Sequence, residues 1–151
     1  MVKTCIIGLA WGDEGKGTIV DFLSPSYEYV ARYNGGANAG HTVVINNKTY
    51  KLHLIPSGIF SSIAVMGSNM VVYPPSLVKE IQELKNNNIK VTPKNLLIDF
   101  RINVTTKYHI ERDKKEEALA GNIGTTCKGV GPTYENLRRG FTLQQLVNNE
   151  Y

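Results

Sequence analysis

The chain has 151 residues, with 17 lysines and arginines against 13 aspartates and glutamates, a formal net charge of +4. Its 42% hydrophobic and 20% charged residues are typical of globular domains and exclude a disordered or collagen-like chain. No apolar run approaches the ~18 residues that a membrane-spanning helix needs, and residues 1–4 show no signal-peptide pattern. We therefore expect a cytoplasmic protein of a single domain, without membrane contact.

Cysteines and basic residues narrow the class further. Cys5 lies in an apolar run and Cys127 in a glycine-rich segment, so they form neither a disulfide framework nor a metal knuckle. Lysine and arginine are spread along the chain, which argues against nucleic acid as a partner. Anionic small molecules such as nucleotides are the better prediction.

The first predicted elements are a strand, a glycine-rich turn and a helix. Residues 2–9 form a short apolar run that predicts a buried strand, and the turn at 11–17 follows it. Residues 18–23 offer the apolar face of a helix that ends before a proline. A second strand at 27–33 leads into another glycine-rich segment, residues 34–42, with three glycines among seven residues.

Further strands are predicted in the middle of the chain. They cover residues 43–45, 49–55, 64–66, 70–73 and 96–99. The first two flank a polar turn at 46–48 and predict a hairpin, and residues 56–58 break its second strand.

Two later helices complete the prediction. Ser76 is the expected N-cap of a helix with Leu77, Ile81 and Leu84 on one face, ending at the asparagines of 86–88. A charged, exposed helix is expected over 106–119. The alternation of strands and helices favours an α/β sheet.

Residues 12–17 combine the parts of a phosphate-binding loop: glycines whose N–H groups can point inward, a lysine, and a helix N-terminus behind them. This is not a standard Walker A loop, because six residues separate Gly8 from Gly15 and Gly17 replaces the Ser or Thr that would hold Mg²⁺. Asp13 is then the candidate metal ligand. A glycine-rich turn with solvated charges is the alternative, but strand, acid, lysine and helix together favour phosphate binding.

His41 follows the second glycine-rich segment instead of lying in an apolar face. A lone histidine is often structural or merely exposed, so both interpretations stay open on this evidence. The amide of Asn38 and the carbonyl of Gly40 strengthen the functional interpretation, because such groups suit a base edge or a cation.

A third glycine-rich segment covers residues 123–132 and precedes Arg138 and Arg139. It is either a long surface loop with a solvated basic pair or a second anion site, in which threonine hydroxyls and arginine forks contact a phosphate. The spacing alone does not decide between them.

Together the three segments resemble adenylosuccinate synthetase, the family of GTP-dependent ligases that join aspartate to IMP. The matching stretches cover residues 11–17, 20–21, 31–42, 51–58, 123–126 and 129–132. The resemblance implies a P-loop-NTPase-like, mostly parallel sheet flanked by helices, the N-terminal portion of that fold. It also implies purine biosynthesis with GTP, IMP and L-aspartate as substrates, Mg²⁺ as cofactor, and a homodimer.

The resemblance assigns the two catalytic roles to Asp13 and His41. Asp13 would take the N1 proton of IMP so that O6 attacks the γ-phosphate of GTP, and it would hold Mg²⁺ together with the Gly40 carbonyl. His41 would stabilise charge on the transferred phosphoryl group, and the aspartate amine would then displace phosphate from 6-phosphoryl-IMP. Lys16 would contact GTP phosphates, and Arg138 would reach the IMP phosphate of the partner subunit.

The same resemblance implies two overlapping sets of binding residues. The GTP set is Gly12, Asp13, Glu14, Gly15, Lys16, Gly17, Thr18, Gly40, His41 and Thr42. The IMP set is Asp13, Glu14, Gly15, Lys16, Asn38, Ala39, Gly40, His41, Thr126 and Arg138.

The sequence departs from the usual family pattern at several positions. Cys-Lys at 127–128 replaces Gly-Arg, and the stretch 134–138 is about two residues short, so Arg139 is an alternative to Arg138. Residues 109–113 look more like the short archaeal and viral branch, which includes phage enzymes acting on dGMP with ATP or GTP. Those enzymes commonly replace the acid of the first loop, so the presence of Asp13 favours IMP.

The length differs most, because family members are more than twice as long. We expect residues 1–151 to be the N-terminal part of one domain, truncated before the segments that recognise the base and the aspartate. Three interpretations follow: part of a ligase that needs a second polypeptide, a nucleotide-binding or dimerising module without ligase activity, and an unrelated small P-loop kinase. The third is weakest, because it leaves Asn38–His41 unexplained.

Overall fold

The computed structural model describes residues 3–10, 14–45, 47–119, 124–137 and 140–148. Its helices and strands are, in chain order, α1 (Lys16–Leu23), β1 (Tyr29–Gly35), β2 (His41–Ile45), β3 (Lys48–Leu52), β4 (Ile63–Val72), α2 (Pro74–Asn86), β5 (Leu96–Ile98), β6 (Asn103–Val104), α3 (Lys107–Leu119), α4 (Val130–Glu135) and α5 (Leu143–Asn148). Two short 3₁₀ turns, η1 (Ser24–Ser26) and η2 (Ser57–Phe60), follow α1 and β3.

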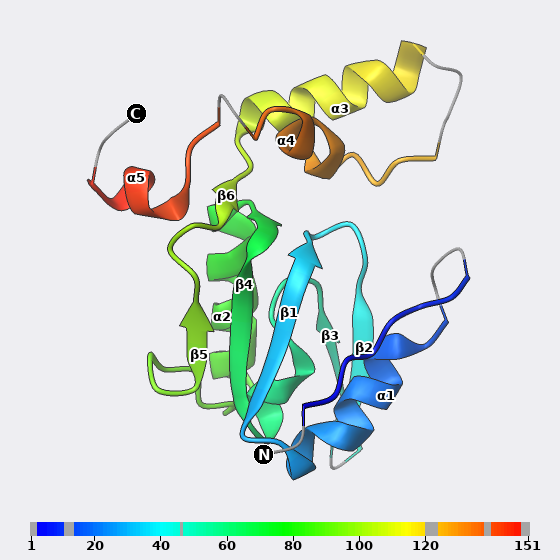
Figure 1. Ribbon diagram of the computed structural model, residues 1–151, viewed down its shortest axis with the longest axis vertical. Coiled ribbons are helices and arrows are strands. Elements are labelled where there is room, and N and C mark those ends of the chain that lie inside the picture. The colour runs from blue at the N-terminus through cyan, green and yellow to red at the C-terminus, as the bar shows by residue number, and fades with distance from the viewer. Residues whose placement is uncertain (1–2, 11–13, 46, 120–123, 138–139, 149–151) are drawn as a thin grey trace.

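Strand β4 lies at the centre of a parallel sheet. It pairs with β1 along one side, with β5 on the other, and with β6 at its carboxyl end, and all three pairings are parallel (Figure 1). Burial follows from this position, since Ala64, Met66 and Met70 are fully buried. The expected mostly parallel sheet flanked by helices is confirmed.

The β2–β3 hairpin forms a separate antiparallel pair beside α1 and completes the core. Its Tyr50 and Leu52 pack in the same hydrophobic cluster as Leu77 and Leu84 of α2. Figure 1 shows α2 behind the sheet and the hairpin with α1 on the β1 side. The predicted hairpin is confirmed, although its second strand ends at Leu52 and not at residue 55.

The two strands predicted at 64–66 and 70–73 are one continuous strand. Gly67 stands at the interruption, and a Cβ there would lie 3.1 Å from the Tyr33 Cα of β1. The β1–β4 register shifts at this level, between Arg32 and Asn34. The glycine therefore admits an irregularity of the neighbouring strand instead of ending its own.

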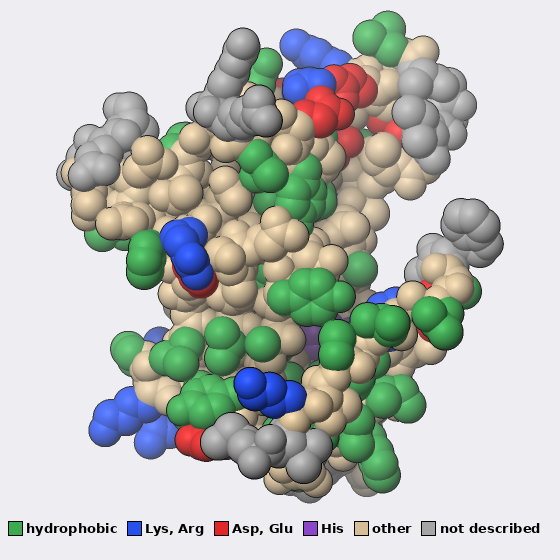
Figure 2. Space-filling view, in the orientation of Figure 1, with side chains coloured by type: hydrophobic (Ala, Val, Ile, Leu, Met, Phe, Trp, Pro, Cys, Tyr) green, Lys and Arg blue, Asp and Glu red, His purple; other side chains and the backbone are tan. Residues whose placement is uncertain are grey.

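The strand predicted at residues 2–9 is not formed over the described residues 3–10. Residues 3–8 belong to no helix or strand and residues 9–10 form a bend, and Ile7 is 62% and Leu9 92% exposed. A short apolar run becomes a buried strand only where neighbouring strands bond its backbone and both faces are covered. Among the described strands β1 pairs with β4 alone, and Figure 2 shows hydrophobic side chains gathered over α1 and this segment.

The predicted N-cap of α2 is also wrong. The helix begins at Pro74, with Tyr73 as N-cap and prolines in the first turn, while Ser76 lies inside. Proline suits this place because it has no N–H to satisfy. The predicted stop is confirmed, since Asn87 is the C-cap and Asn88 has a φ of 63°.

Helix α3 matches its prediction in extent but not in exposure. Its His109 is 3% and its Asp113 6% exposed, because α4 packs against this face. The third glycine-rich segment is correspondingly only partly a loop, since Val130 already begins α4. Among the described residues, no helix has the length and apolar character that crossing a membrane requires.

Candidate functional site

One cavity of about 930 Å³ opens between the N-terminus of α1, the carboxyl end of β1 and the start of β2. Its lining includes most of the described residues to which the sequence assigned a role. These are Glu14, Gly15, Lys16, Gly17, Thr18, Asn38, Ala39, Gly40, His41 and Thr42. The first and second glycine-rich segments therefore form two walls of one site.

The other four predicted site residues are not among these lining residues. Gly12, Asp13 and Arg138 lie outside the described residues. Thr126 is described, but it is exposed on the loop before α4 and does not line the cavity.

The phosphate-loop wall, residues 10 and 14–18 of the described chain, includes a helix N-terminus as predicted. Gly15 is the N-cap of α1 with a φ of 74°, a conformation that favours glycine, and no side chain of the described residues caps the helix. The N–H groups of the first turn are thus available to an anion. Glu14 accepts a hydrogen bond from the Ala10 N–H at 3.1 Å and pairs with Lys16.

His41 connects this wall to the second one. A Cβ on Gly17 would lie 2.7 Å from the His41 Cβ, so glycine is needed for α1 to approach β2 this closely. Burial, with the positive charge of Arg32 and the proximity of the His53 ring, lowers the pKa of His41 to about 4. The imidazole is therefore neutral at pH 7.

Two buried polar atoms in the lining of the cavity have no hydrogen-bond partner among the described residues. They are the His41 Nε2 and the Ser57 Oγ, the latter on a residue that is 2% exposed. Native structures rarely leave such groups unsatisfied, so each calls for an explanation. A polar ligand in the cavity would supply the missing partners.

The glycine-loop wall, residues 34–41, is held by side chains from distant parts of the chain. Arg32 donates to the Gly36 carbonyl at 2.8 Å, to the Asn34 carbonyl at 3.3 Å and to the His53 carbonyl. The Tyr134 hydroxyl accepts from the Gly35 N–H at 2.8 Å and donates to a β4 carbonyl at 2.6 Å. These bonds fix the wall before any ligand arrives.

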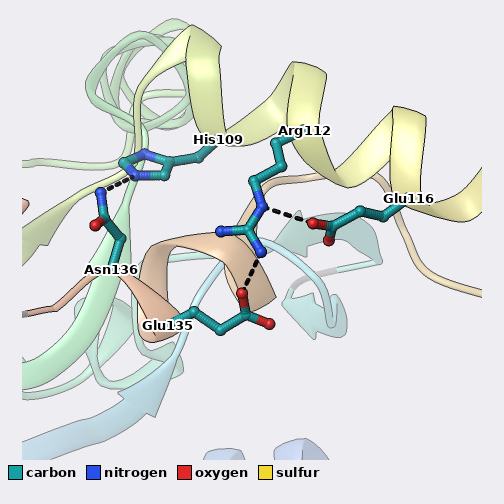
Figure 3. A network of polar contacts seen from close by, with 5 residues as sticks. All are labelled: His109, Arg112, Glu116, Glu135 and Asn136. Carbon is teal, nitrogen blue, oxygen red and sulfur yellow. Dashed lines mark hydrogen bonds and ion pairs between the residues drawn. The ribbon is translucent and has the colours of Figure 1, made fainter.

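The loop that carries Thr126 is anchored between α3 and α4. Asp113 accepts from the Gly129 N–H at 2.7 Å, and Glu117 accepts from the Gly124 N–H at 2.8 Å. Figure 3 shows the adjoining contacts. Arg112 pairs with Glu116 within α3 and with Glu135 of α4.

His109 lies beside these contacts and faces Asn136 (Figure 3). Burial lowers its pKa, and the Arg112 charge adds to that effect. Its Nδ1 accepts the Thr106 N–H at 3.0 Å, and its Nε2 lies 3.3 Å from the Asn136 amide nitrogen. This histidine has a structural explanation, unlike His41.

Oxygen donors suited to Mg²⁺ border the cavity, namely the Glu14 carboxylate and the backbone at Gly40. No cluster of three or more acidic, histidine or cysteine side chains occurs within the described part of the chain. This donor set fits an ion that is held by a few protein oxygens and by substrate phosphates, as Mg²⁺ usually is.

Sequence reasoning missed four residues that shape the site. Arg32 and Ser57 lie inside matching stretches but carried no assigned role, and Tyr134 lies just beyond one. Glu80 had a visible signal: it is three residues after Leu77 and four before Leu84, which places a carboxylate on the apolar face of α2.

Similarity to known proteins is extensive. The family model for adenylosuccinate synthetase matches residues 5–151. The adenylosuccinate synthetases of Streptococcus sanguinis (strain SK36) and Streptococcus gordonii (strain Challis) are each 50% identical over 99% of the chain. The chain spans 36% of the length of these relatives.

Two solved structures resemble this fold. A fully ligated adenylosuccinate synthetase from Plasmodium falciparum matches with a TM-score of 0.82 and 38% identity, over 93% of this chain and 34% of that one. The succinoaminodeoxyadenylate synthetase of cyanophage S-2L, bound to dGMP and dATP, matches with a TM-score of 0.70 over 92% of this chain and 40% of that one. Its 24% identity establishes likeness of fold alone. By sequence and by fold, the chain belongs to the adenylosuccinate synthetase family.

Proposed function

We propose that this chain forms the phosphoryl-transfer part of an enzyme that ligates L-aspartate to IMP at the expense of GTP. The observation that carries the proposal is the unpartnered His41 Nε2 in a cavity bordered by both glycine-rich walls. A half-buried imidazole with its Nε2 shielded, between an exposed helix N-terminus and a fixed glycine loop, is placed to contact a transferring phosphoryl group.

The two walls divide the substrates between them. GTP phosphates would occupy the N-terminus of α1, where Lys16 and backbone N–H groups supply positive charge. IMP would lie against residues 38–41, with its phosphate reached by Thr126 and by Arg138 of the partner subunit in a homodimer.

The reaction has two steps with Asp13 as base. Its carboxylate takes the N1 proton of IMP, and O6 attacks the γ-phosphorus of GTP, which releases GDP and leaves 6-phosphoryl-IMP. The aspartate amine then attacks C6, and the C6–O bond breaks with phosphate as leaving group. A carboxylate of ordinary pKa ~4 is a weak base for this proton, so closure of a dry site is required.

His41 would stabilise the charge that develops on the transferred group. In the free site its pKa is held at about 4, so it enters as a neutral imidazole. A phosphate anion beside Nε2 raises that pKa, because an opposite charge favours the protonated ring. Histidine and phosphate thereby form a charge-assisted hydrogen bond where burial makes it strong.

Mg²⁺ would be held by Asp13 and the Gly40 carbonyl, the ligands that the family resemblance assigns. The ion supplies positive charge to the β- and γ-phosphates. Lys16 and the α1 N-terminus add to that charge from the protein side.

IMP is favoured over dGMP as the purine substrate. The relatives at 50% identity are adenylosuccinate synthetases, whereas the dGMP-bound phage protein is similar in fold alone. Asp13, the base that N1 of IMP requires, is present.

The chain would act as the N-terminal part of a larger cytoplasmic catalytic domain. It spans 36% of its relatives, and Leu9 and Phe22 are 92% and 80% exposed. Apolar side chains this exposed suit a surface that other family segments cover.

A mixing experiment tests this function. The chain with GTP, Mg²⁺, IMP and aspartate should bind nucleotide but form no adenylosuccinate, and a polypeptide carrying the remaining family segments should restore product. Asp13→Asn in the restored enzyme should keep nucleotide binding and abolish turnover. Absence of nucleotide binding by the chain in every combination would contradict the proposal.

A further inference from the structure

The buried carboxylate of Glu80 lies outside the cavity, on the core-facing side of α2. The residue is 6% exposed, between the core residues Leu77 and Leu84. A carboxylate is almost never buried this deeply without specific partners. The hydrogen-bond donors that compensate the buried Glu80 carboxylate therefore indicate what this residue does.

Its partners are three consecutive backbone N–H groups. The His53 N–H donates to both carboxylate oxygens at 3.2 Å, the Leu54 N–H to both at 3.1 and 3.2 Å, and the Ile55 N–H to Oε1 at 2.9 Å. Burial raises the pKa of Glu80, and these three N–H groups act against that rise. The carboxylate thus fixes the turn that follows β3.

Arg32 holds the same turn from its other side. Its guanidinium donates to the His53 carbonyl, while the His53 N–H donates to Glu80. The negative charge of Glu80 raises the pKa of Arg32, although burial lowers it more. The backbone of His53 therefore lies between the buried carboxylate of Glu80 and the half-buried guanidinium of Arg32.

The other bonds of Arg32 connect this arrangement to the glycine-loop wall. The guanidinium also donates to the carbonyls of Asn34 and Gly36. The His53 ring lies against the far end of the same wall, since a Cβ on Gly40 would be 2.8 Å from the His53 Cε1. A shift of the 53–55 turn would consequently move both Arg32 and the chain at Gly40.

We propose that Glu80 is a positioning residue for the phosphoryl-transfer site: through the backbone of His53 and the guanidinium of Arg32, it sets where Gly40 and His41 meet the substrates. The proposal rests on the proposed function, because it names what orients that site. Glu80 itself touches neither substrate nor cavity.

The test is Glu80→Gln, which keeps the shape but leaves one oxygen acceptor for three N–H groups. The matched control is Glu83→Gln on the same helix, since Glu83 is exposed and makes only a 3.8 Å ion pair with Lys79. Both variants of the full chain are compared with wild type at a temperature where each is folded. Amide exchange and backbone resonances are recorded first, without ligand.

In Glu80→Gln the 53–55 amides should exchange at least about tenfold faster, and the resonances of Gly40 and His41 should shift. Mg²⁺–GTP and IMP should then bind the folded variant about tenfold more weakly, which a merely stabilising residue would not cause. Glu83→Gln should resemble wild type in all measurements. If Glu80→Gln does not fold, Arg32→Lys tests the same connection from its other end, with the same expected shifts at Gly40 and His41.

Two results would overturn the proposal. One is unchanged Gly40 and His41 resonances in the folded variant, and the other is shifted resonances with wild-type affinity for both nucleotides. Failure of the proposed function is distinguishable, because wild type would then bind neither nucleotide. The resonances measured without ligand would still decide whether Glu80 sets the position of the wall.

Discussion

The two walls of the cavity are held in different ways. The glycine-loop wall is bonded by Arg32, by Tyr134 of α4 and, through His53, by Glu80 of α2. In the described part of the phosphate-loop wall, Glu14 accepts from the Ala10 N–H and pairs with Lys16, both within four positions of it. Side chains from distant elements brace the first wall, whereas the polar contacts described for Glu14 in the second join near neighbours in sequence.

Because of this difference, we expect substitutions in the two walls to affect different properties, the stability of the fold in one case and ligand affinity in the other. Contacts between exposed charges such as Lys16 and Glu14 contribute little, about 0–1 kcal/mol each. Bonds to buried backbone groups are costlier to lose, about 1–3 kcal/mol for each group left unsatisfied. Substitutions on the glycine-loop wall should therefore destabilise the fold, and those on the phosphate-loop wall should affect ligands.

Arg32→Ala should have the largest effect on stability. It removes the donor to three backbone carbonyls, which we expect to cost about 3 kcal/mol in the free energy of unfolding. Urea denaturation measures this cost. Arg101→Ala is the control, because its ion pair with Asp99 is exposed, and a loss in Arg32→Ala no larger than in the control would refute the tertiary bracing.

His41 should make the fold sensitive to acid. Its folded pKa of about 4 lies below the ordinary 6.5, so the unfolded chain binds the proton more tightly. Stability should therefore fall as the pH drops from 6.5 to 4. The whole pKa shift corresponds to about 3 kcal/mol, and solvent screening of a half-buried ring reduces the expected loss to about 2 kcal/mol.

The comparison of wild type with His41→Asn isolates this contribution. Glu80 has a raised pKa, so its contribution to stability falls as the pH rises above 4.5, opposite to that of His41. His109 has a lowered pKa, so its contribution changes with pH in the same direction as that of His41. Both residues are present in each protein, so they cancel in the difference. Parallel stability curves for wild type and His41→Asn would mean that His41 is not protected from protonation.

Tyr134→Phe should destabilise the chain by about 1–2 kcal/mol, since it leaves the Gly35 N–H without its acceptor. Tyr108→Phe is the matched control, because Tyr108 is 64% exposed. Chemical denaturation of both variants gives the answer. Equal stability of Tyr134→Phe and Tyr108→Phe would show that α4 does not stabilise the glycine-loop wall through Tyr134.

Lys16→Met should have the smallest effect on stability, below about 0.5 kcal/mol, because its partner Glu14 lies in an exposed ion pair. Its affinity for Mg²⁺–GTP should nevertheless fall about tenfold or more, since a phosphate contact is lost. Calorimetric titration and urea unfolding together check the split. A variant that loses stability but not affinity would reverse the roles of the two walls.

The sequence predicted which segments line the cavity better than it predicted the side chains that hold those segments in place. Glycines, Lys16 and His41 were recognisable because their types and spacing bear directly on phosphate binding. The burial of Glu80 and the reach of Tyr134 depend on which elements pack together, and local pattern does not contain that. Residues 3–10 show the same limit, since an apolar run becomes a strand only beside partners.

The protonation of His41 tests the central claim most directly. Its imidazole can be titrated by NMR in the chain labelled at histidine, first free and then saturated with Mg²⁺–GTP. The free pKa should be about 4, and bound triphosphate should raise it by at least about one unit. A His41 pKa that stays at its free value in the saturated chain would contradict contact between this histidine and the phosphoryl group.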